Sequence, residues 1–373
     1  MNSFKRPTEN IGLYIHVPFC KSKCPYCNFY SLCNNNIADE YTKSVLSSLE
    51  SYGKKLNRTA DTLYIGGGTP PLLGEDNLSK IVAGAKKHFN LTKDAEITCE
   101  VNPTSADKDF FEKLFKAGVN RISIGVQSGI DDELVALGRK HTTKQVVETV
   151  SIAKEVEFTN ISLDLMLGIP NQTIESLQKS IEFLVSLNPT HISAYLLKIE
   201  PDTYFGKNMP QNLPDEELCA DLYEKAVEIL SEKGYYQYET SNFAKFGFES
   251  RHNLKYWHCE EYLGIGPSAH SFIDGERFFY PSNITDFISG NSPVLDGDGG
   301  DFEEYAMLTL RLAEGLIFKN VKYRFNIDIP QKMIDNAKIL SKIGLVILDD
   351  IGIRLTPKGQ LLSNAVIGKL LDL

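Results

Sequence analysis

Short runs of β-branched and aromatic residues alternate with longer stretches of helical period along the first two thirds of the chain. The apolar runs are Leu13–Val17, Thr62–Ile65, Glu96–Glu100, Arg121–Val126, Asn160–Leu165 and His191–Leu197. The helical stretches are Ile37–Leu56, Asp76–Phe89, Asp107–Ala117, Thr143–Val156, Ile174–Leu187 and Asp215–Lys233. Strands and helices that alternate at this spacing pair in parallel through right-handed crossovers. Six such units are fewer than the eight of a closed barrel, so the pattern predicts an α/β fold with an incomplete parallel (β/α)6 barrel.

The pattern changes after Tyr236. Residues 241–300 are rich in aromatic residues, Gly, Pro, Ser and Asn without a clear helix period, and they predict a connecting segment. Helical period then returns in Phe302–Ala313 and Ile329–Ile343, followed by a hairpin of Leu345–Leu348 with Ile353–Leu355 and a last helix over Pro357–Leu371. These elements resemble a winged-helix module. We therefore expect a partial barrel over residues 1–240, a connecting segment over 241–300 and a C-terminal module over 301–373.

Composition and charge narrow the class of protein. The chain has 373 residues, 42% of them hydrophobic and 24% charged, which is typical of globular proteins. A net charge of −10 argues against a protein that binds the phosphate backbone of nucleic acids. The C-terminal module has ten Lys and Arg against nine Asp and Glu, whereas a DNA-reading domain is strongly basic. We therefore expect the module to pack against the barrel and expect no nucleic-acid partner.

The chain shows no sign of export or of a membrane span. The run Ile343–Leu348 is the longest apolar stretch and is far below the roughly 20 residues that a span requires. The segment Met1–Pro7 has a basic start without an apolar stretch behind it, so we expect no signal peptide. Seven cysteines, an odd number, favour free thiols over disulfides. These observations predict a cytoplasmic protein.

Three cysteines form the strongest motif of the chain. Cys20, Cys24 and Cys27 follow the first predicted strand at a spacing of four and three residues. Three neighbouring thiolates suit either zinc or an iron–sulfur cluster. Structural zinc requires a fourth ligand, which Cys33 or His16 could provide. A cubane held by three cysteines instead leaves one iron open to a small molecule, and the motif alone leaves both alternatives open.

Further polar and glycine residues stand at the carboxyl ends of the predicted strands. Gly66-Gly67-Gly68-Thr69-Pro70 ends the second strand, where missing Cβ atoms allow the backbone to approach a ligand closely. Glu100 ends the third strand, Gln127 the fourth, and Asp164 lies near the end of the fifth. Each of these residues alone could be a helix cap or form a loop salt bridge. Because all strand ends of a parallel barrel meet at one rim, together they predict a site for hydroxyl and ammonium groups, such as those of a nucleoside and an amino acid.

The run Tyr14–Phe29, with the Gly-Gly-Gly-Thr-Pro segment after it, resembles the radical S-adenosylmethionine superfamily. The likeness is to the branch that holds the oxygen-independent coproporphyrinogen III oxidases (HemN) and the HemW heme chaperones, and it extends into a HemN-like C-terminal domain. It implies that the three cysteines hold a [4Fe-4S] cluster whose open iron binds the amino and carboxylate groups of S-adenosylmethionine. The resemblance also implies that nine residues contact the cluster or this cofactor: Tyr14, Tyr26, Gly67, Gly68, Thr69, Glu100, Gln127, Arg139 and Asp164. Arg139 is expected in a short helical stretch after Gln127.

Two departures from the oxidase pattern favour the chaperone branch. The oxidases resemble Cys-x3-Cys-x2-Cys-x-Cys, and this chain has Phe29 at the last position. Only nineteen residues precede Cys20, whereas the oxidases carry a longer segment there. The resemblance implies a heme chaperone that passes heme to respiratory hemoproteins, membrane-associated ones among them, and without oxidase activity. The alternative is a radical enzyme that decarboxylates coproporphyrinogen III to protoporphyrinogen IX, and a homodimer is left open.

The segment His252-Asn253-Leu254-Lys255-Tyr256-Trp257 matches the heme-binding signature of the chaperone branch. The resemblance implies heme contacts for His252, Asn253, Tyr256 and Trp257, since imidazole ligates heme iron and aromatic rings offer flat apolar area. The neighbouring His258 and Cys259 are alternative iron ligands. The segment Gly264–Ala269 is close to the glycine-rich sequence motif of dinucleotide-binding proteins. That motif requires a preceding strand and a following helix, which the sequence does not predict here, so we expect only a turn. The remaining cysteines, Cys33, Cys99 and Cys219, are expected to be structural or incidental.

Overall fold

A computed structural model describes residues 9–372 of the chain. The prediction that the N-terminal segment is not a signal peptide concerns residues that lie outside this range. Within residues 9–372, no helix is both long and apolar enough to span a bilayer.

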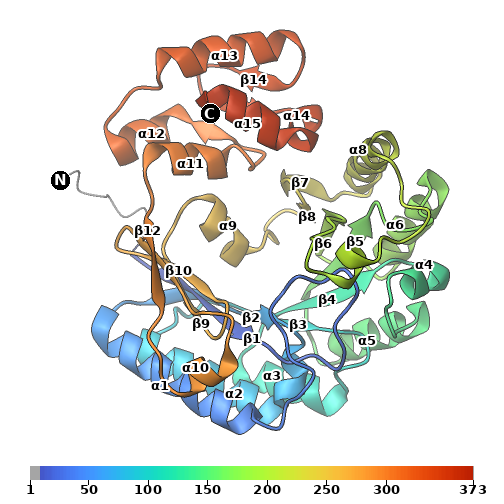
Figure 1. Cartoon of the computed structure of the whole chain (residues 1–373), viewed down its shortest axis with the longest axis vertical. Helices are drawn as coiled ribbons and strands as arrows, with labels where there is room; N and C mark the ends of the chain where they lie inside the picture. Colours follow the sequence, from blue (N-terminus) through green and yellow to red (C-terminus); the bar gives the residue numbers. More distant parts are fainter. Residues whose placement is uncertain (1–8, 373) are drawn as a thin grey trace.

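The first two thirds of the chain fold into six consecutive strand–helix units (Figure 1). The strands are β1 (Ile11–Val17), β2 (Ala60–Gly67), β3 (Glu96–Val101), β4 (Arg121–Gln127), β5 (Asn160–Leu167) and β6 (His191–Leu196). The helices are α1 (Ala38–Leu56), η1 (Pro70–Leu73), α2 (Glu75–Phe89), α3 (Lys108–Ala117), α4 (Asp131–Ala136), α5 (Thr143–Glu155), α6 (Ile174–Ser186), α7 (Tyr204–Lys207) and α8 (Glu216–Glu232). The six predicted strands are thus present in the predicted order.

The strands form an open sheet. Strands β1 to β6 pair in parallel in sequence order, with Tyr14 opposite Tyr64 in the register of β1 and β2. Leu13 and Ile15 of β1 are fully buried in the main hydrophobic core beneath the helices. Tyr14 and His16, between and after them, lie on the opposite, concave face, because successive side chains of a strand alternate. The sheet begins at β12 and ends at β7 without a pairing between these two strands, which confirms the incomplete barrel.

Residues 241–300 extend this sheet and contain more regular structure than the sequence pattern suggested. They follow β7 (Tyr236–Glu239) and comprise β8 (Asn242–Ala244), α9 (Arg251–Trp257), β9 (Tyr262–Ile265), β10 (His270–Ile273), β11 (Glu276–Phe279), α10 (Ile284–Ile288) and β12 (Val294–Asp298). Strand β9 pairs in parallel with β1, while β10, β11 and β12 continue as an antiparallel meander. Strands of three to five residues are too short to produce a visible period. Gly264 and Ile265 accordingly lie in strand β9, and only the rest of the Gly264–Ala269 segment forms the predicted turn.

The C-terminal module packs a second, smaller core. It contains α11 (Phe302–Thr309), β13 (Leu316–Ile317), α12 (Phe318–Phe325), α13 (Gln331–Lys342), β14 (Val346–Leu348), β15 (Gly352–Leu355), α14 (Pro357–Leu361) and α15 (Ser363–Leu371). Strand β13 adds to the predicted hairpin, α12 was not predicted, and the last predicted helix is divided into α14 and α15. The core of the module includes Cys259 and Phe272 from the sheet region, and Arg324 donates to the carbonyl oxygens of His258 and Cys259 at 2.9 and 2.7 Å. The module therefore packs against the barrel, as its charge balance predicted.

Candidate functional site

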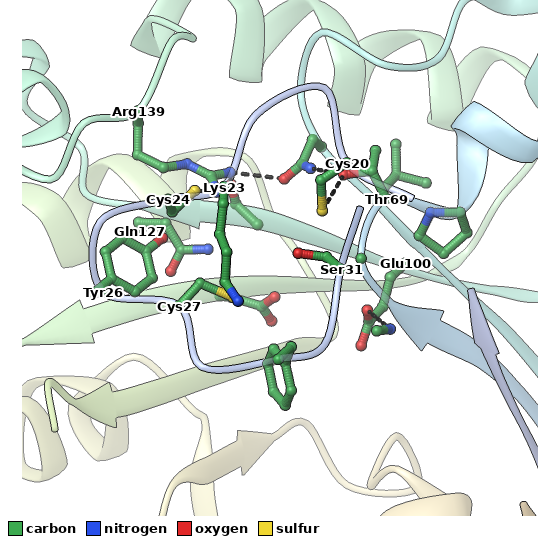
Figure 2. Close-up of a pocket in the computed structure, with 18 of the residues that line it drawn as sticks. Cys20, Lys23, Cys24, Tyr26, Cys27, Ser31, Thr69, Glu100, Gln127 and Arg139 are labelled. Atoms are coloured by element: carbon green, nitrogen blue, oxygen red, sulfur yellow. Dashed lines mark hydrogen bonds between the residues drawn. The ribbon is translucent and has the colours of Figure 1, made fainter. Parts of the chain in front are cut away.

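A loop between β1 and α1 carries the three cysteines across the carboxyl ends of the strands. Backbone hydrogen bonds close the base of this loop, from Cys20 N to Leu32 O at 2.9 Å and from Leu32 N to Pro18 O at 2.6 Å. Beneath the loop lies a cavity of about 380 Å³ (Figure 2). All three cysteines line it, together with eight of the nine predicted cofactor contacts: Tyr26, Gly67, Gly68, Thr69, Glu100, Gln127, Arg139 and Asp164. The strand ends thus converge on one rim as the sequence predicted, and we call this cavity the thiol pocket.

The thiols of this pocket are free and partly shielded from water. Cys20, Cys24 and Cys27 form no disulfide, and burial raises the pKa of the Cys20 and Cys27 thiols. The neutral thiol is therefore favoured in the absence of a cation, whereas a nearby iron ion would favour the thiolate. The buried hydroxyl of Ser31, which also lines the pocket, has no hydrogen-bond partner within residues 9–372. Soft thiol donors with an unused hydroxyl beside them fit a sulfur-containing cluster.

A chain of hydrogen bonds connects two of the cysteines across the pocket wall (Figure 2). Arg139 donates from Nη1 to Cys24 Sγ at 3.4 Å and from Nη2 to Asn102 Oδ1 at 2.8 Å. Asn102 Nδ2 donates to Thr69 Oγ1 at 2.9 Å, and this hydroxyl donates to Cys20 Sγ at 3.8 Å. Asn102 was not predicted as a site residue, although its place two residues after Glu100 at the same strand end would have indicated it. Arg139 itself lies in the connection after α4, not in a helix.

The glycines at the end of β2 serve the packing of the barrel itself. A Cβ atom on Gly66 would lie 2.7 Å from the Glu100 carboxylate, and one on Gly68 would lie 2.6 Å from the carbonyl oxygen of Phe19. The Gly67 N–H donates to Glu100 Oε2 at 2.9 Å and the Gly68 N–H donates to Val17 O at 2.8 Å. Both N–H groups are therefore used within the protein. From the sequence, we interpreted the missing Cβ atoms as room for a ligand. The structure shows that the packing of the barrel itself also requires glycine at positions 66 and 68.

Two carboxyl groups of the pocket hold protons more strongly than usual. Burial raises the pKa of Glu100 to about 7, although Tyr64 donates to its Oε1 at 2.8 Å. Burial likewise raises the pKa of Asp164 to about 6, although a hydrogen bond of 3.2 Å from the Ser123 hydroxyl acts to lower this pKa. Near neutral pH these groups can accept or donate hydrogen bonds, which suits hydroxyl and ammonium groups of a ligand.

Other residues of the rim show how the pocket is shaped. Gln127 has a φ of 74° and follows a register shift between β4 and β5, a strained backbone typical of functional sites. Tyr195 of β6 also lines the pocket and is 40% exposed, and the sequence had not indicated it. Tyr14 is absent from the lining of the thiol pocket; its hydroxyl forms a hydrogen bond of 2.8 Å with His16 Nδ1.

A second cavity of about 290 Å³ adjoins the thiol pocket. Phe29 lines both cavities and is 64% exposed. The walls of the second cavity come from β1, the cysteine loop, α9, β9 and the beginning of β10, and its lining residues are Tyr14, His16, Asn28, Phe29, Tyr30, Tyr256, Tyr262, Ser268 and His270. We call it the aromatic cavity.

The four residues of the predicted heme segment differ in accessibility. His252 is only 1% exposed, and its ring nitrogens form hydrogen bonds of 2.8 Å with Thr62 Oγ1 and 2.7 Å with the Tyr256 hydroxyl. Burial, and then the charges of Lys255 and Arg121, lower the pKa of His252 to about 3. Tyr256 lines the aromatic cavity. Asn253 and Trp257 are half-buried on α9 and outside the lining of that cavity.

The two alternative iron ligands are also engaged. His258 Nε2 lies 2.8 Å from Glu314 Oε1. Cys259 is 1% exposed in the core of the C-terminal module, and burial raises the pKa of its thiol to about 11. Neither side chain lines the aromatic cavity.

Comparison with known proteins places the chain in a family. The sequence model of the Radical SAM superfamily matches residues 14–184, and that of the HemN C-terminal domain matches residues 301–362. A protein of Bacillus subtilis named heme chaperone HemW is 35% identical over 96% of this chain and 98% of its own length. The chain belongs to the HemW family. The HemW protein of Escherichia coli is 40% identical over 71% of each chain, which agrees with the resemblance found in the sequence.

The HemW family shares its fold with the oxidase branch. The solved structure of coproporphyrinogen III oxidase (HemN) from Escherichia coli, described as a radical SAM enzyme, superposes with a TM-score of 0.85. The match covers 98% of this chain and 90% of that chain at 23% sequence identity. At this identity the likeness concerns the fold alone, and it agrees with the partial barrel and the C-terminal module.

Proposed function

We propose that this chain is a heme chaperone that binds heme, a [4Fe-4S] cluster and S-adenosylmethionine, and that it delivers heme to acceptor hemoproteins. The observation that carries this proposal is the similarity to proteins named heme chaperone HemW over nearly the whole chain. Phe29, in place of the further cysteine of the oxidase pattern, supports the same branch. Its exposed ring between the two cavities offers apolar surface and no thiol.

In this proposal Cys20, Cys24 and Cys27 hold the cluster in the thiol pocket. When bound, the cluster supplies an open iron for the amino and carboxylate groups of S-adenosylmethionine. The guanidinium of Arg139 donates a hydrogen bond of 3.4 Å to Cys24 Sγ and so holds this sulfur in position at the pocket wall. Glu100, Gln127 and Asp164, with Tyr26 and the Gly67–Thr69 backbone, form the polar walls for the rest of the cofactor.

Heme binding is assigned to the side of the barrel where α9 lies on the concave face of the sheet (Figure 1). His252, Asn253, Tyr256 and Trp257 belong to this helix. The aromatic cavity beside it supports the assignment, because aromatic side chains bury the faces of a flat macrocycle well. The acceptors are proposed to be hemoproteins, membrane-associated ones among them.

The experiment that tests the proposal compares two activities of the anaerobically purified protein. Hemin titration is expected to shift the Soret band, and the loaded protein is expected to transfer heme to an apo-hemoprotein. Incubation with coproporphyrinogen III, S-adenosylmethionine and a reductant is expected to give no protoporphyrinogen. The variant Phe29→Cys restores the oxidase spacing and serves as the matched control for the role of that position. Protoporphyrinogen formation by the wild type without heme binding would instead identify an oxidase.

A further inference from the structure

The hydroxyl of Ser31 is a buried hydrogen-bond donor that the protein itself does not use. Its Oγ atom is shielded from water and has no hydrogen-bond partner within residues 9–372. Among the buried side-chain atoms of this range that lack a partner, it is the one that lines the thiol pocket. Burying a hydroxyl without a partner costs free energy, and such groups in folded proteins usually face a water or a ligand. Ser31 therefore offers a donor to the group that occupies the pocket.

The base of the cysteine loop aims this hydroxyl into the pocket. Leu32 pairs with Phe19 in a parallel bridge and accepts from Cys20 N at 2.9 Å, and its side chain packs against the main hydrophobic core. Because successive side chains of an extended segment point to opposite sides, Ser31 faces away from this core. Figure 2 shows its hydroxyl pointing into the pocket on the side of Cys20. Burial raises the pKa of the Cys20 thiol, and the hydroxyls of Thr69 and Ser31 act to lower it.

The other side-chain donors beside the thiols are already engaged. Thr69 donates to Cys20 Sγ at 3.8 Å, and Arg139 donates to Cys24 Sγ at 3.4 Å. An iron–sulfur cluster adds sulfide ions to the thiolates, and hydrogen bonds to these sulfur atoms influence its reduction potential. A hydroxyl proton that faces such a sulfur stabilises the reduced cluster more than the oxidised one, because the reduced cluster has one more negative charge. An additional donor therefore makes the cluster easier to reduce.

We propose that Ser31 donates a hydrogen bond to a sulfur atom of the iron–sulfur cluster on the side of Cys20, and that this bond raises the reduction potential of the cluster. The inference rests on the proposed binding of a [4Fe-4S] cluster by the three cysteines. Because the hydroxyl has no partner among residues 9–372, its removal costs the fold no hydrogen bond that the structure shows. The cluster and the stability of the protein are therefore expected to respond differently to the same substitution.

The test is a redox titration of the anaerobically purified full-length protein, followed by the paramagnetic signal of the reduced cluster. Ser31→Ala is expected to lower the equilibrium constant for reduction roughly tenfold, a shift of about 59 mV to lower potential for one electron. Ser31→Thr keeps a hydroxyl and is expected to retain most of the wild-type potential. Ser51→Ala, at an exposed position of α1, is the matched control and is expected to leave the potential unchanged.

Denaturant unfolding of the cluster-free proteins provides a second readout. Ser31→Ala is expected to be at least as stable as the wild type, because it removes a buried hydroxyl without a partner. A loss of stability in this variant would show that the hydroxyl serves the fold, and it would contradict the inference.

The outcomes of the redox titration separate the inference from the proposed function. If Ser31→Ala holds the cluster at the wild-type potential, the assignment of Ser31 is wrong while cluster binding stands. A shift that arises only after S-adenosylmethionine is added would overturn the assignment in favour of a hydrogen bond to that cofactor. If the wild type itself holds no cluster, this part of the proposed function fails and the inference fails with it.

Discussion

Replacing His252 by alanine is expected to destabilise the protein strongly, whether or not heme is present. The ring lies stacked on Tyr64 at 5.4 Å between centroids, and it is the hydrogen-bond partner of two hydroxyl groups. Its removal leaves the hydroxyls of Thr62 and Tyr256 without this partner and opens a cavity where the ring was. Each buried polar group left without a partner costs about 1–3 kcal/mol, and the lost packing adds to this, so we expect a total of about 3–5 kcal/mol.

Denaturant unfolding followed by circular dichroism measures this effect, with two milder variants as controls. Tyr256→Phe and Thr62→Val each remove one hydroxyl and keep the His252 ring in place. Each is expected to destabilise the protein by about 1–2 kcal/mol, clearly less than His252→Ala. A wild-type unfolding midpoint for His252→Ala would refute the argument, because it would mean that the ring is not an integral part of the interior. A loss of heme binding in this variant must be interpreted against its loss of stability.

The low pKa of His252 also predicts how the stability of the protein depends on pH. The unfolded chain binds a proton on this ring below pH of about 6.5, whereas burial keeps the folded ring neutral down to a pKa of about 3. Acidification therefore favours the unfolded state, and from pH 7 to pH 5 this residue removes about 2 kcal/mol of stability. Glu100 and Asp164 act in the opposite direction, since their raised pKa values make the folded state bind protons first. The measurement therefore compares the free energy of unfolding of the wild type and of His252→Gln at pH 7 and at pH 5. On acidification the variant should lose about 2 kcal/mol less of this free energy than the wild type, and equal losses would contradict the burial of His252.

Three further predictions concern the thiol pocket. Purified without oxygen, the wild type should be brown with close to four irons and four sulfides per chain, as expected for a cubane cluster, and Cys24→Ser should lose iron and colour; bound zinc without sulfide would reject the cluster. Asn102→Ala should release the cluster faster than the wild type during chelator challenge, because it interrupts the hydrogen-bond chain between Cys24 and Cys20, whereas Asn102→Asp keeps the acceptor for Arg139 and should retain more iron. Gly68→Val should lower the yield of folded protein, because the Cβ of the new side chain would lie 2.6 Å from a backbone oxygen. If the variant instead folds normally and loses only the change that S-adenosylmethionine causes in the spectrum of the cluster, the glycine serves the ligand and not the fold.

The sequence predicted the barrel well because each of its strands carries a strong local signal. Leu13, Ile15 and their counterparts in β2 to β6 form runs that are buried beneath helices of clear period. Strands β8 to β12 have no such signal, because they have only three to five residues. They gain stability from pairing: β8 pairs with β6, β9 pairs with β1, and β10, β11 and β12 follow on β9 in turn. The pairing of β9 with β1 joins residues about 250 positions apart, and local periodicity contains no information about such contacts.

That the candidate residues lie together could be predicted where unusual residue types stand at strand ends, and could not be predicted where it depends on contacts distant in sequence. The cysteines, Glu100 and Asp164 are visible because their types are unusual at strand ends. Asn102 is an ordinary residue, and its place in the wall of the thiol pocket follows only from the side chains that lie beside it in space. Likewise, nothing in the motif around His252 indicates that both of its nitrogens are occupied.

The hydrogen-bond chain between Cys24 and Cys20 also matters for the protein before a cluster is inserted. It runs through Arg139, Asn102 and Thr69. The chain and the closed base of the loop order the cysteine segment in advance, so that cluster insertion requires little further loss of chain entropy. Burial of Cys20 and Cys27 keeps their thiols protonated, and protonated thiols react slowly with oxidants. Without a cluster, hydrogen bonds therefore already hold the sulfur atoms of Cys24 and Cys20 in place, and burial protects the thiols of Cys20 and Cys27 from oxidation.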